Sequence, residues 1–307
     1  MLRRILLYLS GAGWARALVS RFFIARRVAR RFIAGETLAE AIDTARELNA
    51  AGLCVTLDYL GESVTDADDT SAVVAMYCRL IEQINAGGLD ASLSLKLTHL
   101  GLDISESLCF DNLRQILAAA QPHGISVNID TESSAYVETT FRMYRQLRDE
   151  HGFDNVATVT QSMLRRTADD MRQFAAEGAR IRLVKGAYLE PESVAYPDKR
   201  DVDAQFIAIM REFLAHTPPA YLDIATHDEQ MIAAALEYIA AHNVPRDGYE
   251  FQMLYGIRTA RHHQLAADGH RMRVYVPFGE AWYPYFMRRL AERPANLWFF
   301  VRSVFRA

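Results

Sequence analysis

Apolar and polar positions along the chain follow two alternating patterns. Short runs rich in apolar and β-branched residues have the length of strands. Between these runs, apolar residues recur with the 3.6-residue period of a helix that buries one face. The strand-like runs are residues 53–60, 91–97, 125–130, 156–161, 181–186, 221–227, 249–255 and 272–278. The helical stretches include residues 37–51, 70–86, 110–120, 135–151, 167–177, 202–215 and 229–241.

This alternation predicts an α/β fold of the (β/α)8 TIM-barrel type. Eight strand–helix units spread over about 250 residues match the usual size of that barrel. An open, doubly wound sheet would alternate in the same way, but it usually carries an early Gly-x-Gly-x-x-Gly turn that is absent here. The first helix has a clear beginning, because Thr37 and Glu40 have the spacing of a capping box.

Charge is spread unevenly and sets off the N-terminus. Residues 1–35 contain eight arginines and no acidic residue, interleaved with apolar side chains. We therefore predict a basic N-terminal helical arm over 1–35, followed by a catalytic domain over 36–307. We favour an arm whose apolar side packs on its own domain. The alternative is an arm that rests on an anionic membrane surface.

The composition excludes several classes of function. A formal net charge of −4 argues against a nucleic-acid partner. The three cysteines form no Cys-x-x-Cys pair and no Cys/His spacing typical of zinc, so we predict no metal site. Such sparse cysteine usage favours a reducing, cytoplasmic location.

Candidate chemistry gathers where the predicted strands end. In TIM-type barrels the active site lies at the carboxyl ends of the strands. The polar residues at those ends are Glu62, Lys96, Asp130, Gln161, Arg182, Lys185, Thr226, His227 and Tyr275.

The stretch YFMRRLAER at 285–293 carries a second group of polar residues after the last predicted strand. On a helix, Tyr285, Arg288, Arg289 and Glu292 share one face. Two guanidinium groups can hold a carboxylate through paired hydrogen bonds. We therefore predict an anion-binding C-terminal helix over the barrel mouth, the end where the strands finish.

Several motifs occur together in one order and spacing. They are RLVKGAY (182–188), ATHD (225–228), YEFQMLYG (249–256) and YxxRRLxE (285–292), with LGE (60–62), SLKL (94–97), NID (128–130) and TQ (160–161). On these motifs the chain resembles flavin-dependent proline dehydrogenase of the short, bacterial monofunctional type, from about residue 37 to 300.

The resemblance implies a distorted (β/α)8 barrel that binds FAD non-covalently, with the last helix above the flavin. It implies oxidation of L-proline to pyrroline-5-carboxylate, with electrons passed to a membrane quinone. A separate pyrroline-5-carboxylate dehydrogenase would then act downstream. The implied location is the cytoplasm, with peripheral contact on the inner face of the cell membrane as an alternative role for the arm.

The resemblance also assigns roles to matching positions. Asp130 and Arg182 are the implied catalytic residues, with Arg182 beside flavin N5, and Glu62 is the implied acidic partner of Arg288 in a substrate gate. The implied substrate-binding residues are Lys96, Arg288 and Arg289 for the carboxylate, and Tyr275, Tyr285, Tyr188 and Leu254 around the ring. The expected cofactor-binding residues are Thr131, Gln161, Arg182, Val184, Lys185, Gly186, Ala187, Thr226, His227 and Glu292.

Two other classes of function stay open from the residues alone. Lys185 at a strand end would suit a class I aldolase that forms a Schiff base. A barrel docked on a membrane through its basic arm could also serve purely as a binding module. The number of ionisable groups that converge on the mouth argues against the binding module.

Overall fold

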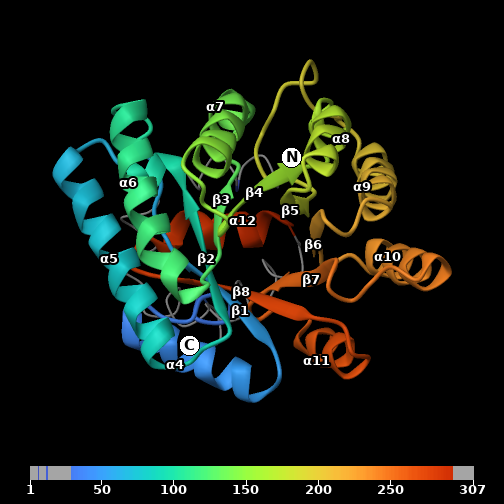
Figure 1. The fold of residues 1–307 in the computed structure, drawn as a ribbon, viewed down its shortest axis with the longest axis horizontal. Coiled ribbons are helices and arrows are strands. Elements are labelled where there is room, and N and C mark those ends of the chain that lie inside the picture. The colour runs from blue at the N-terminus through green and yellow to red at the C-terminus, as the bar shows by residue number, and fades with distance from the viewer. Residues whose placement is uncertain (1–5, 7–11, 13–28, 293–307) are drawn as a thin grey trace.

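The computed structural model describes Leu6, Ala12 and residues 29–292, except the side chain of Glu292. Eight parallel strands close into one barrel in chain order, and β8 pairs with β1 to complete it. Helices surround the strands (Figure 1), which confirms the predicted (β/α)8 fold. The strands are β1 Cys54–Tyr59, β2 Ala91–Lys96, β3 Val127–Asp130, β4 Val156–Gln161, β5 Arg180–Val184, β6 Tyr221–Ala225, β7 Tyr249–Leu254 and β8 Met272–Phe278.

The helices follow the predicted pattern closely. The α-helices are α4 Leu38–Ala50, α5 Ala67–Ala86, α6 Glu106–Ala120, α7 Ser134–Arg145, α8 Thr167–Ala176, α9 Lys199–Leu214, α10 Glu229–His242, α11 Thr259–Ala267 and α12 Trp282–Glu292. Two short 3₁₀ turns are Leu97–Leu100 and Gln121–His123. The predicted capping box is present, since the Thr37 hydroxyl accepts from the Glu40 amide at 3.3 Å and a Glu40 oxygen accepts from the Thr37 amide at 3.1 Å.

One predicted helix changes its form part of the way along. The stretch 135–151 is α-helical only to Arg145 and continues as a π-helical turn over Gln146–Glu150. The apolar period of a sequence cannot distinguish these two helix types, because it reports which face is buried and not which carbonyl each amide contacts.

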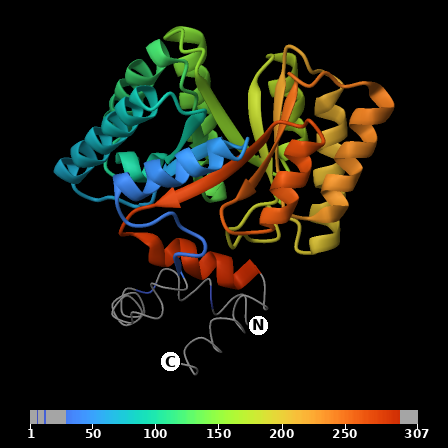
Figure 2. The same ribbon diagram turned by 90° about the horizontal axis from the view of Figure 1, so that it is seen from below.

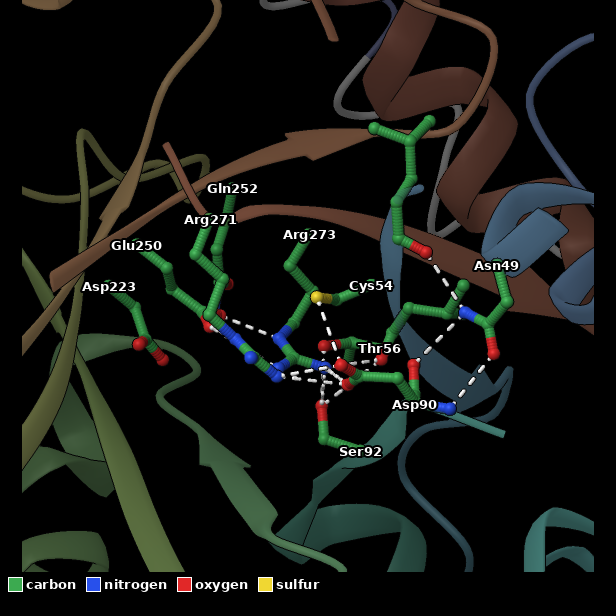
Figure 3. A network of polar contacts seen from close by, with 12 residues as sticks. Asn49, Cys54, Thr56, Asp90, Ser92, Asp223, Glu250, Gln252, Arg271 and Arg273 are labelled. Carbon is green, nitrogen blue, oxygen red and sulfur yellow. Dashed lines mark hydrogen bonds and ion pairs between the residues drawn. The ribbon is translucent and has the colours of Figure 1, made fainter. Parts of the chain in front are cut away.

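The inside of the barrel is unusually polar where the strands begin. Arg273 on β8 donates to Glu250 on β7 at 2.6 Å, and Arg180 on β5 pairs with Asp223 on β6 at 2.9 Å. Figure 3 shows much of this group, which also includes Arg271 and which we call the floor network. TIM-type barrels are more commonly filled by branched apolar side chains. The outward-facing strand residues are apolar and pack against the helices.

Helix α12 lies apart from the helices that ring the barrel. Figure 2 shows it beside one end of the strands, next to the segment that leads into α4. Phe286 of α12 belongs to a buried cluster that includes Ala29, Phe32 and Ile33. These residues of the predicted arm pack on their own domain, while most of 1–35 lies outside the described residues. No helix in the described part of the chain is both long and apolar enough to cross a bilayer.

Candidate active site

Four predicted site residues meet at the centre of the barrel mouth. Lys96 and Asp130 are register partners on β2 and β3, with Lys96 Nζ 3.8 Å from Asp130 Oδ2. Asp130 accepts from Arg182 Nη1 of β5 at 2.8 Å and lies 2.9 Å from the hydroxyl of Tyr275 of β8. The guanidinium carbon of Arg182 lies 5.4 Å from the centre of the Tyr275 ring. Strands far apart in the sequence therefore contribute to one compact polar site.

The central groups keep fixed protonation states because of their neighbours. Burial alone would lower the pKa of Lys96, but the carboxylates of Asp58 and Asp130 raise that pKa above its usual value. Burial raises the pKa of Tyr275 well above its ordinary value, and the two carboxyl groups add to the effect. Lys96 is therefore an ammonium and Tyr275 a neutral phenol across the physiological pH range.

Sequence reasoning missed three side chains that hold this centre. Asp58 of β1 lies 2.7 Å from the Tyr275 hydroxyl, and Ser94 of β2 donates to Asp130 at 2.7 Å. Gln252 of β7 accepts from Arg182 Nε at 2.6 Å. Strand parity was the available signal, since residues two apart point to the same side of a strand. Ser94 stands two residues before Lys96, and Asp58 is the one charged residue in the strand-like run 53–60.

Helix α12 brings Arg288 to the same mouth. Arg288 Nη1 pairs with both oxygens of Glu62, at 3.0 and 3.1 Å. Burial would raise the pKa of Glu62, but Arg288 lowers it below the ordinary range, so the carboxylate stays charged. The guanidinium carbon of Arg289 lies 4.9 Å from the Tyr285 ring centre. Glu62 and Arg288 are therefore in contact, while a gating role for the pair stays a prediction.

Tyr188 and Leu254 complete the predicted substrate-binding set. Burial raises the pKa of the Tyr188 hydroxyl, and Arg288 and Lys96 are among the charges that act on it. Leu254 packs against the cluster that contains α12, and its amide donates to Nε2 of His227 at 2.9 Å. Both residues therefore adjoin the mouth, and a ring nitrogen of His227 is occupied by the backbone.

Two buried polar atoms in the predicted cofactor-binding set lack partners among the described residues: Nη2 of Arg182 and Oε1 of Gln161. The amide nitrogen of Gln161 donates to the carbonyl of Glu132 at 2.7 Å, which holds the side chain in place. Arg182 is likewise held through its other nitrogens by Asp130 and Gln252. The structure thus presents a rigid donor and a rigid acceptor, both shielded from water.

Other members of that set lie at the ends of neighbouring strands. Gly186 has a φ of +107°, and a Cβ added there would lie 2.5 Å from the sulfur of Met163, so only glycine fits. The Thr226 hydroxyl accepts from the Asp228 amide at 3.1 Å, and the Thr131 hydroxyl donates to the carbonyl of Val159. Val184 and Ala187 are half-buried on either side of Gly186, and the side chain of Glu292 lies outside the described residues.

Lys185 makes contacts that the sequence did not predict. Its ammonium donates to Asp203 of α9 at 2.6 Å and to Asp228, the residue that caps α10, at 2.7 Å. Burial would raise the pKa of Asp228, but the Lys185 contact outweighs it and lowers that pKa to about 2. The resemblance assigned Lys185 to cofactor binding, and in this structure its partners are carboxylates.

Comparison with known proteins agrees with this arrangement. A family model described as proline dehydrogenase matches residues 41–302. Proline dehydrogenase 1 of Bacillus subtilis (strain 168) is 42% identical, over 99% of this chain and 99% of its own. Proline dehydrogenase of Deinococcus radiodurans is 39% identical, over 90% of each chain.

A solved structure shows the same fold. It is proline utilization A (PutA) from Bdellovibrio bacteriovorus inactivated by N-propargylglycine, with a TM-score of 0.81 and 25% identity over 91% of this chain and 34% of that one. The family model spans most of the barrel, and the curated relatives match almost from end to end. The chain whose mouth brings Lys96, Asp130, Arg182 and Tyr275 together thus belongs to the proline dehydrogenase family.

Proposed function

We propose that this chain oxidises L-proline to pyrroline-5-carboxylate with a non-covalently bound FAD. The main support for the proposal is that two features occur together at the barrel mouth. Buried polar atoms that have no hydrogen-bond partner among the described residues adjoin a cluster of cations that suits a carboxylate. Membership in the proline dehydrogenase family supports the reaction, and the names of the curated relatives support proline as the substrate.

The residues of the mouth fit a flavin. Its ring edge carries both acceptors and a donor, which complement Nη2 of Arg182 and Oε1 of Gln161. A bound FAD would supply the hydride acceptor for the substrate carbon. The remaining members of the expected set, including Thr131, Val184, Lys185, Ala187, Thr226, His227 and Glu292, would line the rest of the cofactor.

Cations of the mouth would orient the substrate. We propose that Lys96, Arg288 and Arg289 bind the proline carboxylate, because charge-assisted hydrogen bonds from several donors fix its direction. Tyr275 and Tyr285, with Tyr188 and Leu254, would then pack around the ring and exclude water. Exclusion of water beside these cations favours the neutral form of the proline nitrogen, which hydride loss requires.

Asp130 and Arg182 would act as a pair. The ion pair and the hydrogen bond from Ser94 hold Asp130 in one orientation, and Asp130 in turn holds Arg182. A buried guanidinium that is fixed in this way stabilises negative charge that develops next to it during the reaction. We therefore assign Arg182 an electrostatic role and assign Asp130 the role of orienting it.

Electrons would then leave to a membrane quinone, and a separate pyrroline-5-carboxylate dehydrogenase would consume the product. The eight arginines of residues 1–35, without an acidic residue, support contact with an anionic membrane from the cytoplasmic side. Co-sedimentation with anionic lipid vesicles, compared with neutral vesicles, tests this contact. Equal recovery with both vesicle types would argue that the arm serves only its own domain.

The alternative hypothesis, that Lys185 forms a Schiff base, is less well supported than the flavin enzyme. A lysine that attacks a carbonyl must present a free amine. Two carboxylates, Asp203 and Asp228, instead hold the Lys185 ammonium at 2.6 and 2.7 Å. A class I aldolase would be inactivated by borohydride in the presence of its substrate. A flavin enzyme would not show this substrate-dependent inactivation.

The visible spectrum of the purified protein tests the main proposal. We expect flavin absorbance that bleaches when L-proline is added without oxygen. We also expect the flavin to be released from the protein on denaturation. A protein that stays colourless and inactive after incubation with FAD would contradict the proposal.

A further inference from the structure

Asp58 is a buried carboxyl group at the centre of the mouth that the assigned roles do not use. It lies on β1, with 1% of its surface exposed. Its Oδ2 is 2.7 Å from the Tyr275 hydroxyl and 3.3 Å from Lys96 Nζ. Its Oδ1 is buried and has no hydrogen-bond partner among the described residues. Asp58 therefore contacts two residues that we assign to substrate binding, and one of its oxygens is left unsatisfied.

The contacts of Tyr275 require one more proton than the phenol carries. Its oxygen lies 2.7 Å from Asp58 Oδ2 and 2.9 Å from Asp130 Oδ2. Both distances are those of hydrogen bonds. One hydroxyl proton can serve only one of them, and two bare oxygens at such a distance would repel each other. A carboxylic acid proton on Asp58 or Asp130 would complete the second bond.

The surroundings decide which carboxyl group holds the proton. Asp130 accepts from Arg182 and from Ser94 through Oδ1, as an ionised carboxylate does. Among the described residues, the one cationic partner of Asp58 is Lys96 at 3.3 Å, and the Asp58 side chain is almost wholly out of water. Burial raises the pKa of Asp58, and Lys96 offsets this only in part.

We propose that Asp58 is a neutral carboxylic acid that donates to the oxygen of Tyr275, so that Tyr275 in turn donates to Asp130. Asp58 is then a positioning residue that holds the Tyr275 ring and leaves the mouth with a surplus positive charge. With Asp58 neutral, Lys96, Arg182, Asp130 and Asp58 together carry one net positive charge. If Asp58 were ionised, the same four groups would sum to zero.

The consequence for the substrate rests on the proposed function. A bound carboxylate beside Lys96 makes ionisation of Asp58 less favourable, so proline binding and the proton on Asp58 stabilise each other. As the pH rises and Asp58 ionises, the mouth loses one positive charge and the proline KM should increase. The ionisable groups that act on Asp58 are Lys96 of β2, Asp130 of β3, Tyr275 of β8 and Tyr77 of α5.

Infrared spectroscopy of the purified holoenzyme tests the protonation directly. At neutral pH we expect a carboxylic acid C=O band that shifts in heavy water and is lost in Asp58→Asn. The matched control is Asp223→Asn, which removes an equally buried aspartate whose partner is the Arg180 guanidinium. A spectrum without such a band, or a band that is lost with Asp223 and kept without Asp58, would overturn the proposal. The band requires no turnover, so this result is independent of whether proline is the substrate.

Kinetics separate positioning from a general structural role. Asp58→Asn keeps the shape of a neutral acid, and we expect its proline KM to lie within about threefold of wild type at neutral pH, with a flatter dependence on pH. Asp58→Ala leaves Tyr275 and Lys96 without this partner, and we expect the KM to rise by about tenfold or more. A KM for Asp58→Asn that rises with pH as steeply as that of wild type, at equal FAD content, would contradict the role in binding.

Discussion

Arg288 and Arg289 are adjacent in sequence but have different surroundings in the structure. Consecutive residues of a helix point in different directions. Arg288 therefore reaches Glu62, whereas the guanidinium of Arg289 lies over the ring of Tyr285. The two guanidinium groups therefore have different neighbours in this structure.

The first prediction concerns this pair. Arg288→Met or Arg289→Met should raise the proline KM by about tenfold or more, because each removes a charge-assisted contact worth about 1.5–3 kcal/mol. Prolinamide, which has no carboxylate, should be a poor substrate of the wild type and should be affected much less by either change. Steady-state kinetics with both substrates measure this. Equal turnover of proline and prolinamide by the wild type would argue against a carboxylate site.

The second prediction concerns ring recognition by Tyr275. Contacts with Asp58 and Asp130 hold its hydroxyl, so the ring cannot move aside for a larger substrate. A 4-hydroxyl group on the substrate would have to displace packed atoms, at about 1–3 kcal/mol. We expect kcat/KM for proline to exceed that for trans-4-hydroxyproline by about tenfold or more.

Two substitutions separate bulk from hydrogen bonding at this position. Tyr275→Ser should reduce the preference for proline, because it opens space beside the ring. Tyr275→Phe keeps the bulk and should keep the preference, even if its rates are lower. Anaerobic flavin reduction by both amino acids is the measurement, and a wild type that reacts equally with both would refute the packing argument.

At the scale of elements, α12 and the loop after β1 are the parts that we propose to open and close the mouth. The Glu62–Arg288 ion pair, at 3.0 Å, joins these two elements, and we assign it to the proposed gate. The pair is partly buried, so its loss should matter more than that of a surface ion pair.

The third prediction is that Glu62→Ala slows flavin reduction by proline more than it alters FAD content. If the pair acts as a gate, its loss should let α12 close less often over the bound substrate and exclude water less well. Glu62→Gln keeps one hydrogen bond to Arg288 and should have an intermediate effect. Stopped-flow reduction and the absorbance ratio of flavin to protein provide the two readouts. A variant that loses FAD in proportion to its rate would point to cofactor binding instead.

Elements were predictable where local signals are strong. The capping residues Thr37 and Glu40 predicted the start of α4, and apolar runs predicted each strand. Strand β5 was expected over 181–186, but it ends at Val184 because Gly186 adopts a positive φ that leaves the strand. A period of two residues carries no information on where such a turn occurs.

The partners of site residues were harder to predict than their identities. Lys185 was expected at the mouth, but Asp203 and Asp228 come from the beginnings of α9 and α10, and no local pattern links them to it. Asp58 was overlooked because a single charge inside a strand most often signals an edge or a salt bridge. Its position between Lys96 and Tyr275 depends on closure of the barrel by β1 and β8.

At the scale of the whole molecule, the floor network joins strands from both halves of the barrel. Glu250 of β7 accepts from Arg273 of β8 and lies 3.2 Å from Arg180 of β5. Its carboxylate also accepts from the amide of Gln252, whose oxygen holds Arg182 in the mouth. A continuous set of contacts therefore links the closed end of the barrel to the proposed catalytic arginine.

The last prediction concerns the stability of this network. Burial would raise the pKa of Glu250, but Arg273 and Arg180 outweigh it and hold that pKa far below the ordinary value. Glu250→Gln leaves Arg273 without its buried counter-charge and Arg180 with Asp223 alone, at a cost of about 3–5 kcal/mol. At roughly 2–4 °C per kcal/mol, the unfolding midpoint should fall by about 10 °C. Asp90→Asn is the matched control, because Asp90 binds the same network through Arg271 (Figure 3). Its side chain is half exposed, so its loss should cost at most about 1 kcal/mol.

The same prediction has a definite dependence on pH. A carboxyl group whose pKa is lower in the folded state stabilises the fold above its unfolded pKa, and this stabilisation is lost as the pH falls through the folded value. The advantage of wild type over Glu250→Gln should therefore be constant near neutrality and begin to shrink below about pH 4.3. Thermal unfolding of both proteins across that range is the measurement. An advantage that grows as the pH falls would mean that Glu250 is not held as a carboxylate, and the floor network would then need a different charge assignment.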